Sequence, residues 1–189
     1  TLRFLETIKE AGERAAKIVS DMLMFSRSNG SKRALVDLVQ LCEKTIGLAA
    51  TDYDLKRQYD FRHVSIVRDF QQDLPSIPCS YSEIQQVLLN LLSNAAQAMY
   101  GDLAKPISDP TITLRICVEG KMVRLEVADN GPGMDEATRK RVFDPFFTTK
   151  SIGVGTGLGL SVSYYIITNN HKGTIEVESK PGVGTRFII

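Results

Sequence analysis

Asp129-Asn130-Gly131-Pro132-Gly133-Met134 is the stretch from which the fold of this chain can be worked out. It closes a run that alternates as a β-strand does, Val123-Arg124-Leu125-Glu126-Val127-Ala128. Asp, Asn, Gly and Pro are ordinary turn residues, so the motif could be only a turn. Asp129, however, stands at the inner end of a strand that looks buried, where a carboxylate without a partner is costly. The exocyclic amino group of an adenine would satisfy that carboxylate.

The segments around this turn mix strands with helices. Residues 111–117 and 122–128 are β-rich, and residues 118–121 between them predict a hairpin. Further strands are predicted over 63–68, 173–178 and 184–189, and a helix over 36–48 with Asp37 and Gln40 as a capping pair. A second helix follows the capping box Ser80-Tyr81-Ser82-Glu83, in which Glu83 is expected to cap. This mixture predicts an α+β, two-layer sandwich and argues against a doubly wound sheet.

Residues 1 to about 28 predict one long helix. Its apolar residues alternate at spacings of four and three, like a heptad seam: Phe4, Ile8, Ala11, Ala15, Ile18, Met22 and Phe25. Such a helix has a face to bury, so it lies either on its own domain or in a helical bundle or dimer. The linker-like run over 26–31 favours the bundle or dimer. We therefore expect two units, residues 1–30 and residues 31–189.

The composition is that of an ordinary globular protein. Its 23 Lys and Arg residues balance 22 Asp and Glu to a net charge of +1, so no global field favours nucleic acid or an anionic membrane. Cys42, Cys79 and Cys117 are widely spaced, and we expect small core residues in a reducing compartment. No apolar run approaches the roughly 18–20 residues that span a bilayer, and we expect a cytoplasmic chain. The sequence reads as a fragment, and membrane anchoring of its parent protein is left open.

The helix after the capping box has two faces. Asn90, Asn94 and Gln97 share one face at i, i+4 and i+7. Amides on a helix are often simply solvated, but their oxygens are suitable ligands for Mg²⁺, which takes its other ligands from water and phosphates. This face carries no carboxylate to serve as a general base, which favours transfer of a phosphoryl group over hydrolysis. The apolar face consists of Ile84, Val87, Leu88, Leu91, Leu92, Ala95 and Met99.

A second glycine-rich run covers 153–159 and leads into apolar residues with helical spacing. Alternate glycines let the backbone approach phosphates, and the start of a helix offers free N–H groups. The run matches neither G-x-G-x-x-G nor a P-loop, and a flexible linker is its plain alternative. Before it, the three phenylalanines of residues 141–150 predict either core or the apolar anchors of a movable lid. Lys150 is expected either to reach a phosphate or to be a solvated surface charge.

These motifs together resemble histidine protein kinases of two-component systems, within the GHKL ATPase superfamily. The family's boxes occur in order: the N box in 86–95, the first glycine box in 129–133, the F box in 143–147, the second glycine box in 155–160 and a closing glycine motif in 182–187. The match covers residues 31–189, and the Phe-Phe-Thr-Thr-Lys form most resembles kinases of the nitrogen-regulation type. The resemblance implies a Bergerat fold, with helices layered on a mixed sheet and ATP under a lid.

The resemblance also implies roles for individual residues. Asp129 would bind the adenine amino group, assisted by Thr185, and Asn94 would be the Mg²⁺ ligand. Asn90 would support the metal and the phosphates, whereas hydrolytic members carry Glu there. A Lys often follows the metal-binding Asn by three residues, and Gln97 stands there instead, so Lys150 is the candidate for the missing charge. The expected ATP and Mg²⁺ site comprises Asn90, Asn94, Gln97, Asp129, Gly131, Gly133, Thr149, Lys150, Gly155, Thr156, Gly157, Leu158, Gly159, Leu160 and Thr185.

The N-terminal helix resembles the second helix of the family's dimerisation and phosphotransfer hairpin, through residues 14–19 and 23–27. The first helix of that hairpin carries the phosphoacceptor histidine, followed by an acidic residue. The two histidines of this chain, His63 and His171, have no acidic next neighbour. The resemblance thus implies a phosphoryl donor domain whose partners are its own missing phosphoacceptor helix and a response regulator. It implies a homodimer through the N-terminal helix and no nucleic-acid partner.

Three rival interpretations stay open. An ATP-hydrolysing machine of the gyrase or chaperone kind would be favoured by Glu at position 90, where this chain has Asn90. A non-enzymatic module that uses the fold for dimerisation would fail to bind nucleotide with Mg²⁺. A serine kinase of the anti-sigma type is disfavoured by the N-terminal heptad helix.

Overall fold

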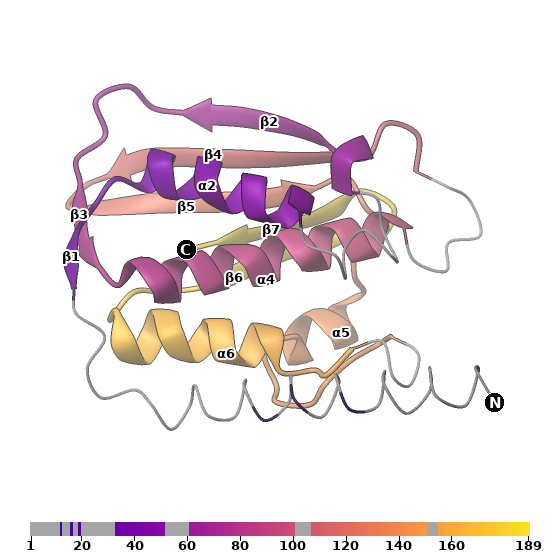
Figure 1. The fold of residues 1–189 in the computed structure, drawn as a ribbon. Helices are drawn as coiled ribbons and strands as arrows, with labels where there is room; N and C mark the ends of the chain where they lie inside the picture. Colours follow the sequence, from indigo (N-terminus) through magenta and orange to yellow (C-terminus); the bar gives the residue numbers. More distant parts are fainter. Residues whose placement is uncertain are drawn as a thin grey trace.

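The computed structural model describes residues 33–51, 61–100, 107–150 and 155–189, together with Gly12, Ala16 and Val19. The described chain has two layers, a five-stranded sheet and a layer of helices that covers one face of it (Figure 1). The strand order is β2-β4-β5-β7-β6, in which β2 and β4 are parallel and the other neighbours antiparallel. This arrangement confirms the predicted two-layer sandwich and its mixed sheet.

The hairpin at the centre of the sheet forms where the sequence predicts it. It consists of β4 (Thr111–Glu119) and β5 (Met122–Asp129). Strand β7 (Gly184–Ile188) follows on the other side of β5, and β6 (Glu176–Lys180) forms the edge, beginning three residues later than predicted. In this register Asp129 lies between Ile112 of β4 and Thr185 of β7. The first glycine motif therefore leaves the sheet from its middle strand.

The predicted strand over 63–68 is wrong by two residues. Strand β2 is Ser65–Phe70, and His63 lies in the 3-10 turn η1 (Phe61–His63). Phe61 and Val64 are buried, 3% and 7% exposed, so the chain enters β2 through a turn that packs apolar side chains into the core. The alternation of apolar residues therefore extends beyond the strand and places its start too early.

The helix α4 (Tyr81–Tyr100) buries every residue of its predicted apolar face and Ala96 as well. The predicted helix over 36–48 is wrong at its start, since α2 is Leu38–Thr51 and Val36 belongs to β1 (Ala34–Val36). β1 pairs with β3 (Ile77–Cys79) in a small separate sheet that was not predicted. Asp37 does cap α2, because its Oδ1 accepts the N–H of Gln40 at 3.1 Å.

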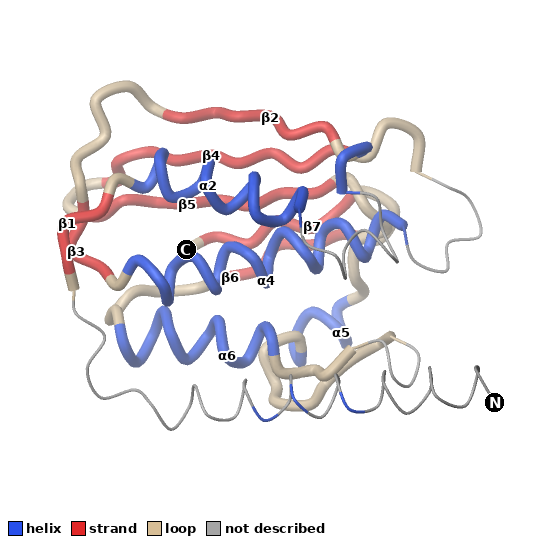
Figure 2. The backbone as a smooth tube through the Cα atoms, viewed as in Figure 1, coloured by secondary structure: helices blue, strands red, loops and turns tan. Residues whose placement is uncertain are grey.

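Two further helical segments follow the sheet hairpin. The helix α5 (Glu136–Arg141) was not predicted and is capped by the side chain of Asp135. The helix α6 (Gly159–Tyr165) continues into a π-helical turn, η2 (Ile166–Asn170). As Figure 2 shows, α6 lies beside α4 and runs in the opposite direction.

The core fills the space between the sheet and the helices. Its largest fully buried side chains come from α2, α4, β4, β5 and η2: Leu41, Val87, Leu88, Leu91, Leu92, Met99, Ile112, Leu114, Ile116, Val127 and Ile167. Burying this many aliphatic side chains is the main stabilising contribution to such a fold. Cys42 and Cys79 are buried and Cys117 is partly buried, which agrees with their expected place in the core.

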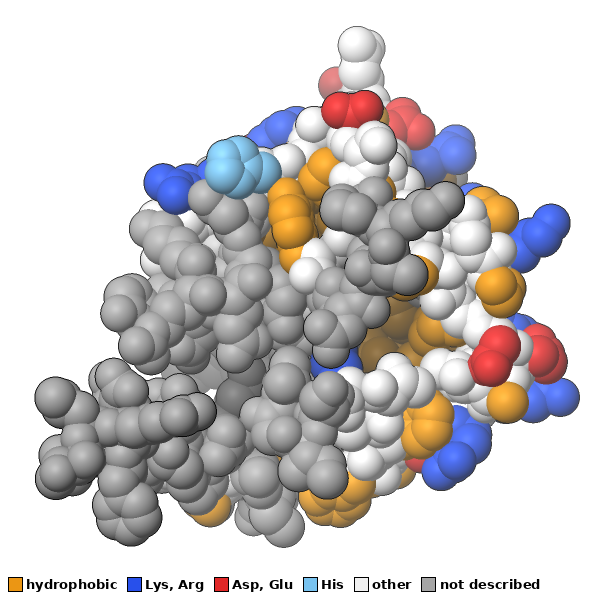
Figure 3. Space-filling view, turned by 90° about the vertical axis from the view of Figure 1, so that its right-hand side faces the viewer, with side chains coloured by type: hydrophobic (Ala, Val, Ile, Leu, Met, Phe, Trp, Pro, Cys, Tyr) orange, Lys and Arg blue, Asp and Glu red, His pale blue; other side chains and the backbone are white. Residues whose placement is uncertain are grey.

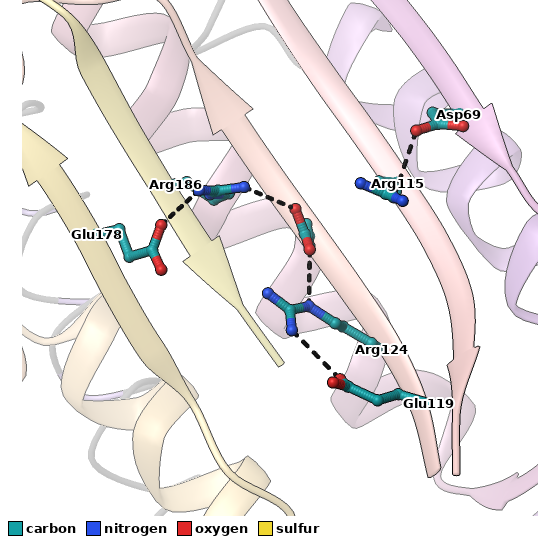
Figure 4. Close-up of polar contacts among 7 residues, drawn as sticks. Asp69, Arg115, Glu119, Arg124, Glu178 and Arg186 are labelled. Carbon is teal, nitrogen blue, oxygen red and sulfur yellow. Dashed lines mark hydrogen bonds and ion pairs between the residues drawn. The ribbon is translucent and has the colours of Figure 1, made fainter.

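The other face of the sheet carries charges that pair with one another (Figure 4). Glu126 is only 6% exposed, and its carboxylate accepts from Arg124 Nε at 2.7 Å and lies 3.5 Å from Arg186 Nη1. Arg124 also pairs with Glu119 and Arg186 with Glu178, so the network joins four strands, β4, β5, β7 and β6. A carboxylate this poorly hydrated requires such partners, and both arginines supply them from the sheet itself.

The predicted N-terminal helix, its heptad seam and the linker after it lie outside the described residues. Only Gly12, Ala16 and Val19 of that segment are described, and each is helical and exposed. No helix within the described ranges is long and apolar enough to cross a membrane.

Candidate nucleotide-binding site

The carboxyl group of Asp129 lies at the end of β5 and is largely withdrawn from water. Burial raises its pKa from an ordinary 3.8 to about 6, and hydrogen bonds from the backbones of Gly131 and Thr185 lower it in part. The Gly131 N–H donates to Oδ1 at 2.9 Å. A buried carboxyl group with a raised pKa at the end of a strand is typical of a ligand-binding site. The structure thus brings together Asp129, Gly131 and Thr185, as the sequence predicts.

The turn after Asp129 packs directly on the end of β6. Gly133 has φ +68°, and a Cβ there would lie 2.1 Å from the carbonyl oxygen of Lys180. Gly133 is therefore required by this packing, whatever else it contacts. Ser179 also links this turn to the sheet. Its Oγ accepts the Met134 N–H at 2.8 Å and lies 3.0 Å from Thr185 Oγ1. Ser179 could not be predicted from the sequence, because its partners come from two other segments, at Met134 and at Gly184 and Thr185.

The three amide side chains predicted to share one face of α4 contact two different parts of the chain. Asn90 Nδ2 donates to the carbonyl oxygen of Gly159 at 3.0 Å and lies 3.3 Å from Ser163 Oγ. Asn94 Oδ1 accepts from Lys150 Nζ at 3.1 Å, and Gln97 Oε1 accepts from the same ammonium group. Asn90 therefore fixes the start of α6, whereas the other two amides hold a cation.

Lys150 points into the site. Its side chain is partly buried against α4, so it is not a solvated surface charge. The two oxygens that hold it are neutral amide oxygens, a ligand type that Mg²⁺ accepts together with water and phosphate. Within the described ranges no group of three or more His, Cys, Asp and Glu could hold a metal. These donors fit a magnesium ion that is bound chiefly through the phosphates of a nucleotide.

The second glycine run approaches this amide face. Gly157 has φ +67°, and a Cβ there would lie 2.5 Å from the carbonyl carbon of Phe146. The Phe146 N–H donates to the Gly157 carbonyl oxygen at 2.9 Å, and Gly155 lies against Thr148 and Lys150. The predicted residues Thr156, Leu158, Gly159 and Leu160 follow into α6, with Leu158 buried, while Thr149 is exposed.

The three phenylalanines of the F box differ from one another. Phe143 packs on Tyr164 and Phe187, with ring centroids 5.5 and 6.2 Å away. The Arg141 guanidinium lies 4.4 Å from the centroid of the Phe147 ring. Phe146 is 63% exposed at φ +64°, so it is not a core residue, whereas Phe143 is partly buried against the core. That the three rings anchor a movable lid stays a prediction.

These groups gather at one end of the molecule. Asp129 ends β5 there, and α4 presents Asn94 and Gln97 toward its own carboxyl end, on the right in Figure 1. Figure 3 looks onto that end and shows a hollow with hydrophobic side chains at its floor. An apolar hollow with one buried carboxyl group and a glycine-rich loop nearby suits a planar base that carries phosphates.

Comparison with known proteins agrees with this geometry. Residues 80–189 match the family described as histidine kinase-, DNA gyrase B-, and HSP90-like ATPase. The chain is 34% identical over 186 residues to the signal transduction histidine-protein kinase AtoS of Escherichia coli (strain K12), covering 98% of this chain and 28% of AtoS. The chain spans about a quarter of the length of the curated relatives that it matches.

Solved structures give the same result. The catalytic domain of the histidine kinase ThkA superposes with a TM-score of 0.66 at 27% identity, covering 83% of this chain and 93% of that domain. Full-length ShkA in complex with AMPPNP superposes with a TM-score of 0.75 at 25% identity, covering 98% of this chain and 37% of ShkA. The chain belongs to the family of histidine kinase-, DNA gyrase B- and HSP90-like ATPases, among the ATP-binding catalytic domains of sensor histidine kinases.

Proposed function

We propose that this chain binds Mg²⁺·ATP and transfers the γ-phosphoryl group to a histidine on a separate helix, from which it passes to a response regulator. The observation that carries the proposal is the composition of the α4 face toward the site. It presents Asn90, Asn94 and Gln97, and an amide cannot take a proton from an attacking water. A histidine acceptor is its own nucleophile and needs no such base.

Each residue of the site receives a role in this proposal. Asp129 accepts a hydrogen bond from the adenine amino group, with Thr185 beside it on β7. Asn94 is the magnesium ligand, and Asn90 holds Gly159 so that the loop before α6 faces the phosphates. The backbone of residues 155–160 binds the phosphate chain, and Gly131 and Gly133 shape the turn under the base. Magnesium, when bound, neutralises charge on the β- and γ-phosphates.

Lys150 supplies a second positive charge in this proposal. Its ammonium group already lies between Asn94 and Gln97, at the position from which a family lysine is missing. When ATP enters, phosphate oxygens replace neutral amide oxygens as its partners, which is a stronger interaction for an ammonium group. Lys150 is therefore assigned to the γ-phosphate end of the nucleotide.

The wider organisation is proposed on the resemblance. Residues 31–189 form the ATP-binding domain, and residues 1–30 form the second helix of a dimerisation and phosphotransfer hairpin. That helix would pair with its counterpart in a homodimer. Support comes from the relatives, since AtoS is by name a signal transduction histidine-protein kinase.

The test is a phosphorylation assay on the chain extended upstream by about 40 residues, enough for a helix and a turn. With labelled ATP and Mg²⁺ we expect an acid-labile, alkali-stable label that a response regulator removes. Label on Ser or Thr would contradict the histidine kinase assignment. Steady ATP turnover by the present chain, with no acceptor supplied, would instead favour a hydrolase of the gyrase or chaperone kind.

A further inference from the structure

A second polar cluster joins α4 and α6 at the end of the helix pair away from the glycine loop. It consists of Ser80 and Glu83 at the start of α4 and of Asn170 and His171 at the end of η2. The Ser80 N–H donates to His171 Nε2 at 3.0 Å, and Asn170 Nδ2 donates to Glu83 Oε1 at 2.8 Å. The side chains of His171 and Glu83 are only 10% and 19% exposed, so these bonds are largely shielded from water.

The contacts of His171 define its protonation state. A backbone N–H can only donate, so Nε2 must carry a lone pair toward Ser80. Nδ1 lies 3.0 Å from the carbonyl oxygen of Ile166, which can only accept, so Nδ1 must carry the proton. The neutral imidazole with hydrogen on Nδ1 is the one form that satisfies both contacts.

His171 thereby takes the place that the sequence assigns to Glu83. In a capping box, the Glu side chain reaches back to the N–H of the N-cap residue. Here the Glu83 N–H still donates to Ser80 Oγ, at 3.4 Å, but the Glu83 carboxylate turns to Asn170. The predicted capping role of Glu83 is therefore wrong. The first free N–H of α4 is satisfied from the end of the neighbouring helix, which no local sequence pattern can indicate.

The cluster and Asn90 tie the two helices at both ends of α6. At its start, Asn90 holds the Gly159 carbonyl and Ser163; at its end, Ser80 and Glu83 hold His171 and Asn170. The loop 155–158 leads directly into Gly159. A shift of α6 along α4 would therefore move this loop relative to Asn94.

We infer that His171, in its neutral form with hydrogen on Nδ1, is a positioning residue of the nucleotide site. It fixes the register of α6 on α4 and, through it, the place of the loop 155–158. This inference rests on the proposed function only in naming that loop as the phosphate-binding element. The tie between Ser80 and His171 does not depend on it.

Nitrogen-15 NMR of the ring tests the protonation state directly. The chain has two histidines, so the His63→Gln variant leaves His171 as the only one. Its two-bond proton–nitrogen correlations at pH 8 are expected to show a neutral imidazole with hydrogen on Nδ1. A proton on Nε2, or a charged ring at pH 8, would overturn the inference and leave the proposed function unaffected.

Calorimetric titration with Mg²⁺ and a non-hydrolysable ATP analogue tests the coupling to the site. His171→Ala should weaken binding roughly threefold to tenfold at pH 8, the effect of one lost hydrogen bond. His171→Gln keeps an acceptor for Ser80, so it should restore much of the affinity.

The controls separate this role from a merely structural one. His63→Ala, at an exposed position, should leave the affinity unchanged. A folded His171→Ala protein with wild-type affinity, or a folded His171→Gln protein that binds no better than His171→Ala, would overturn the inference. No binding by wild type would instead contradict the proposed function.

Discussion

Asp129 combines a cost to stability with a proposed role in binding. Replacing it by Asn keeps an acceptor for the Gly131 N–H but removes the charge. In calorimetric titrations we expect Asp129→Asn to weaken Mg²⁺·ATP binding about 10- to 100-fold, the range for a hydrogen bond to a charged group. Glu119→Gln, at a carboxylate that is 67% exposed on the sheet hairpin, is the matched control and should bind normally. Wild-type affinity in Asp129→Asn would exclude the adenine role.

The same carboxyl should make stability depend on pH. Its folded pKa, about 6, lies above the ordinary 3.8, so its contribution is most favourable below about pH 4 and is lost as the pH rises through 6. The difference corresponds to about 3 kcal/mol at most. In urea unfolding of the nucleotide-free protein, Asp129→Asn should therefore be more stable than wild type at pH 8 and equal to it near pH 4. An Asp129→Asn protein that is less stable than wild type at pH 8 would contradict this cause.

The role proposed for the Lys150 ammonium group can be tested by moving that charge to residue 97. Lys150→Met keeps the length of the side chain, and we expect it to weaken Mg²⁺·ATP binding about tenfold in the same titrations. Adding Gln97→Lys to that variant should restore part of the affinity, because both side chains bring an ammonium group to the same place on α4. Lys121→Met, at the exposed tip of the hairpin, is the control. Failure of the second substitution to restore binding would show that the charge must come from residue 150.

At the scale of elements, the close packing of Gly133 on β6 can be tested separately from its positive φ angle. Gly133 and Gly120 have similar positive φ angles, +68° and +62°, but a Cβ at 133 meets the Lys180 carbonyl whereas nothing lies within 4 Å at 120. Gly120→Ala should cost about 1–2 kcal/mol of unfolding free energy, for φ alone. Gly133→Ala should cost about 1–3 kcal/mol more, because the strand end must move. Equal costs in urea unfolding would contradict the packing argument.

The elements that the sequence predicts well are those with a long repeated pattern. The apolar face of α4 repeats over about four turns, and every residue of it is buried. The hairpin β4–β5 has two alternating runs and a turn between them. The site residues that lie within such elements or their ends, such as Asn94 and Asp129, could therefore be placed in advance.

The elements that the sequence misses have little pattern of their own. β1 and β3 contain three residues each and exist because they pair with one another. α5 buries none of its residues, so no apolar period marks it. The partners of Glu83, Lys150 and Ser179 come from distant segments, and a single sequence holds no signal that joins them. Their positions follow only once the sheet and the helices are packed.

At the scale of the whole molecule, binding should stabilise the fold. A ligand at a concentration of 100 times its Kd adds about 2.7 kcal/mol, which raises the Tm of a chain of this size by about 5–10 °C. We expect that rise for Mg²⁺·ATP in differential scanning fluorimetry, a smaller rise with EDTA present, and at most about half of it for Asp129→Asn, whose affinity should be about 10- to 100-fold lower. A rise that is the same with and without Mg²⁺ would argue against a metal in the site.

The π-helical turn at the end of α6 has a consequence for sequence length. It closes over five residues, with the His171 N–H donating to the Ile166 carbonyl at 3.1 Å. Deleting one residue, such as the exposed Asn169, would return the turn to the α-helical period and rotate His171 by about 100° away from Ser80. The exposed Asn169 should thus accept many exchanges of side chain, but residues 166–170 should accept no change of number. A homologue that is one residue shorter here would have to cap its counterpart of α4 from within that helix, as an ordinary capping box does.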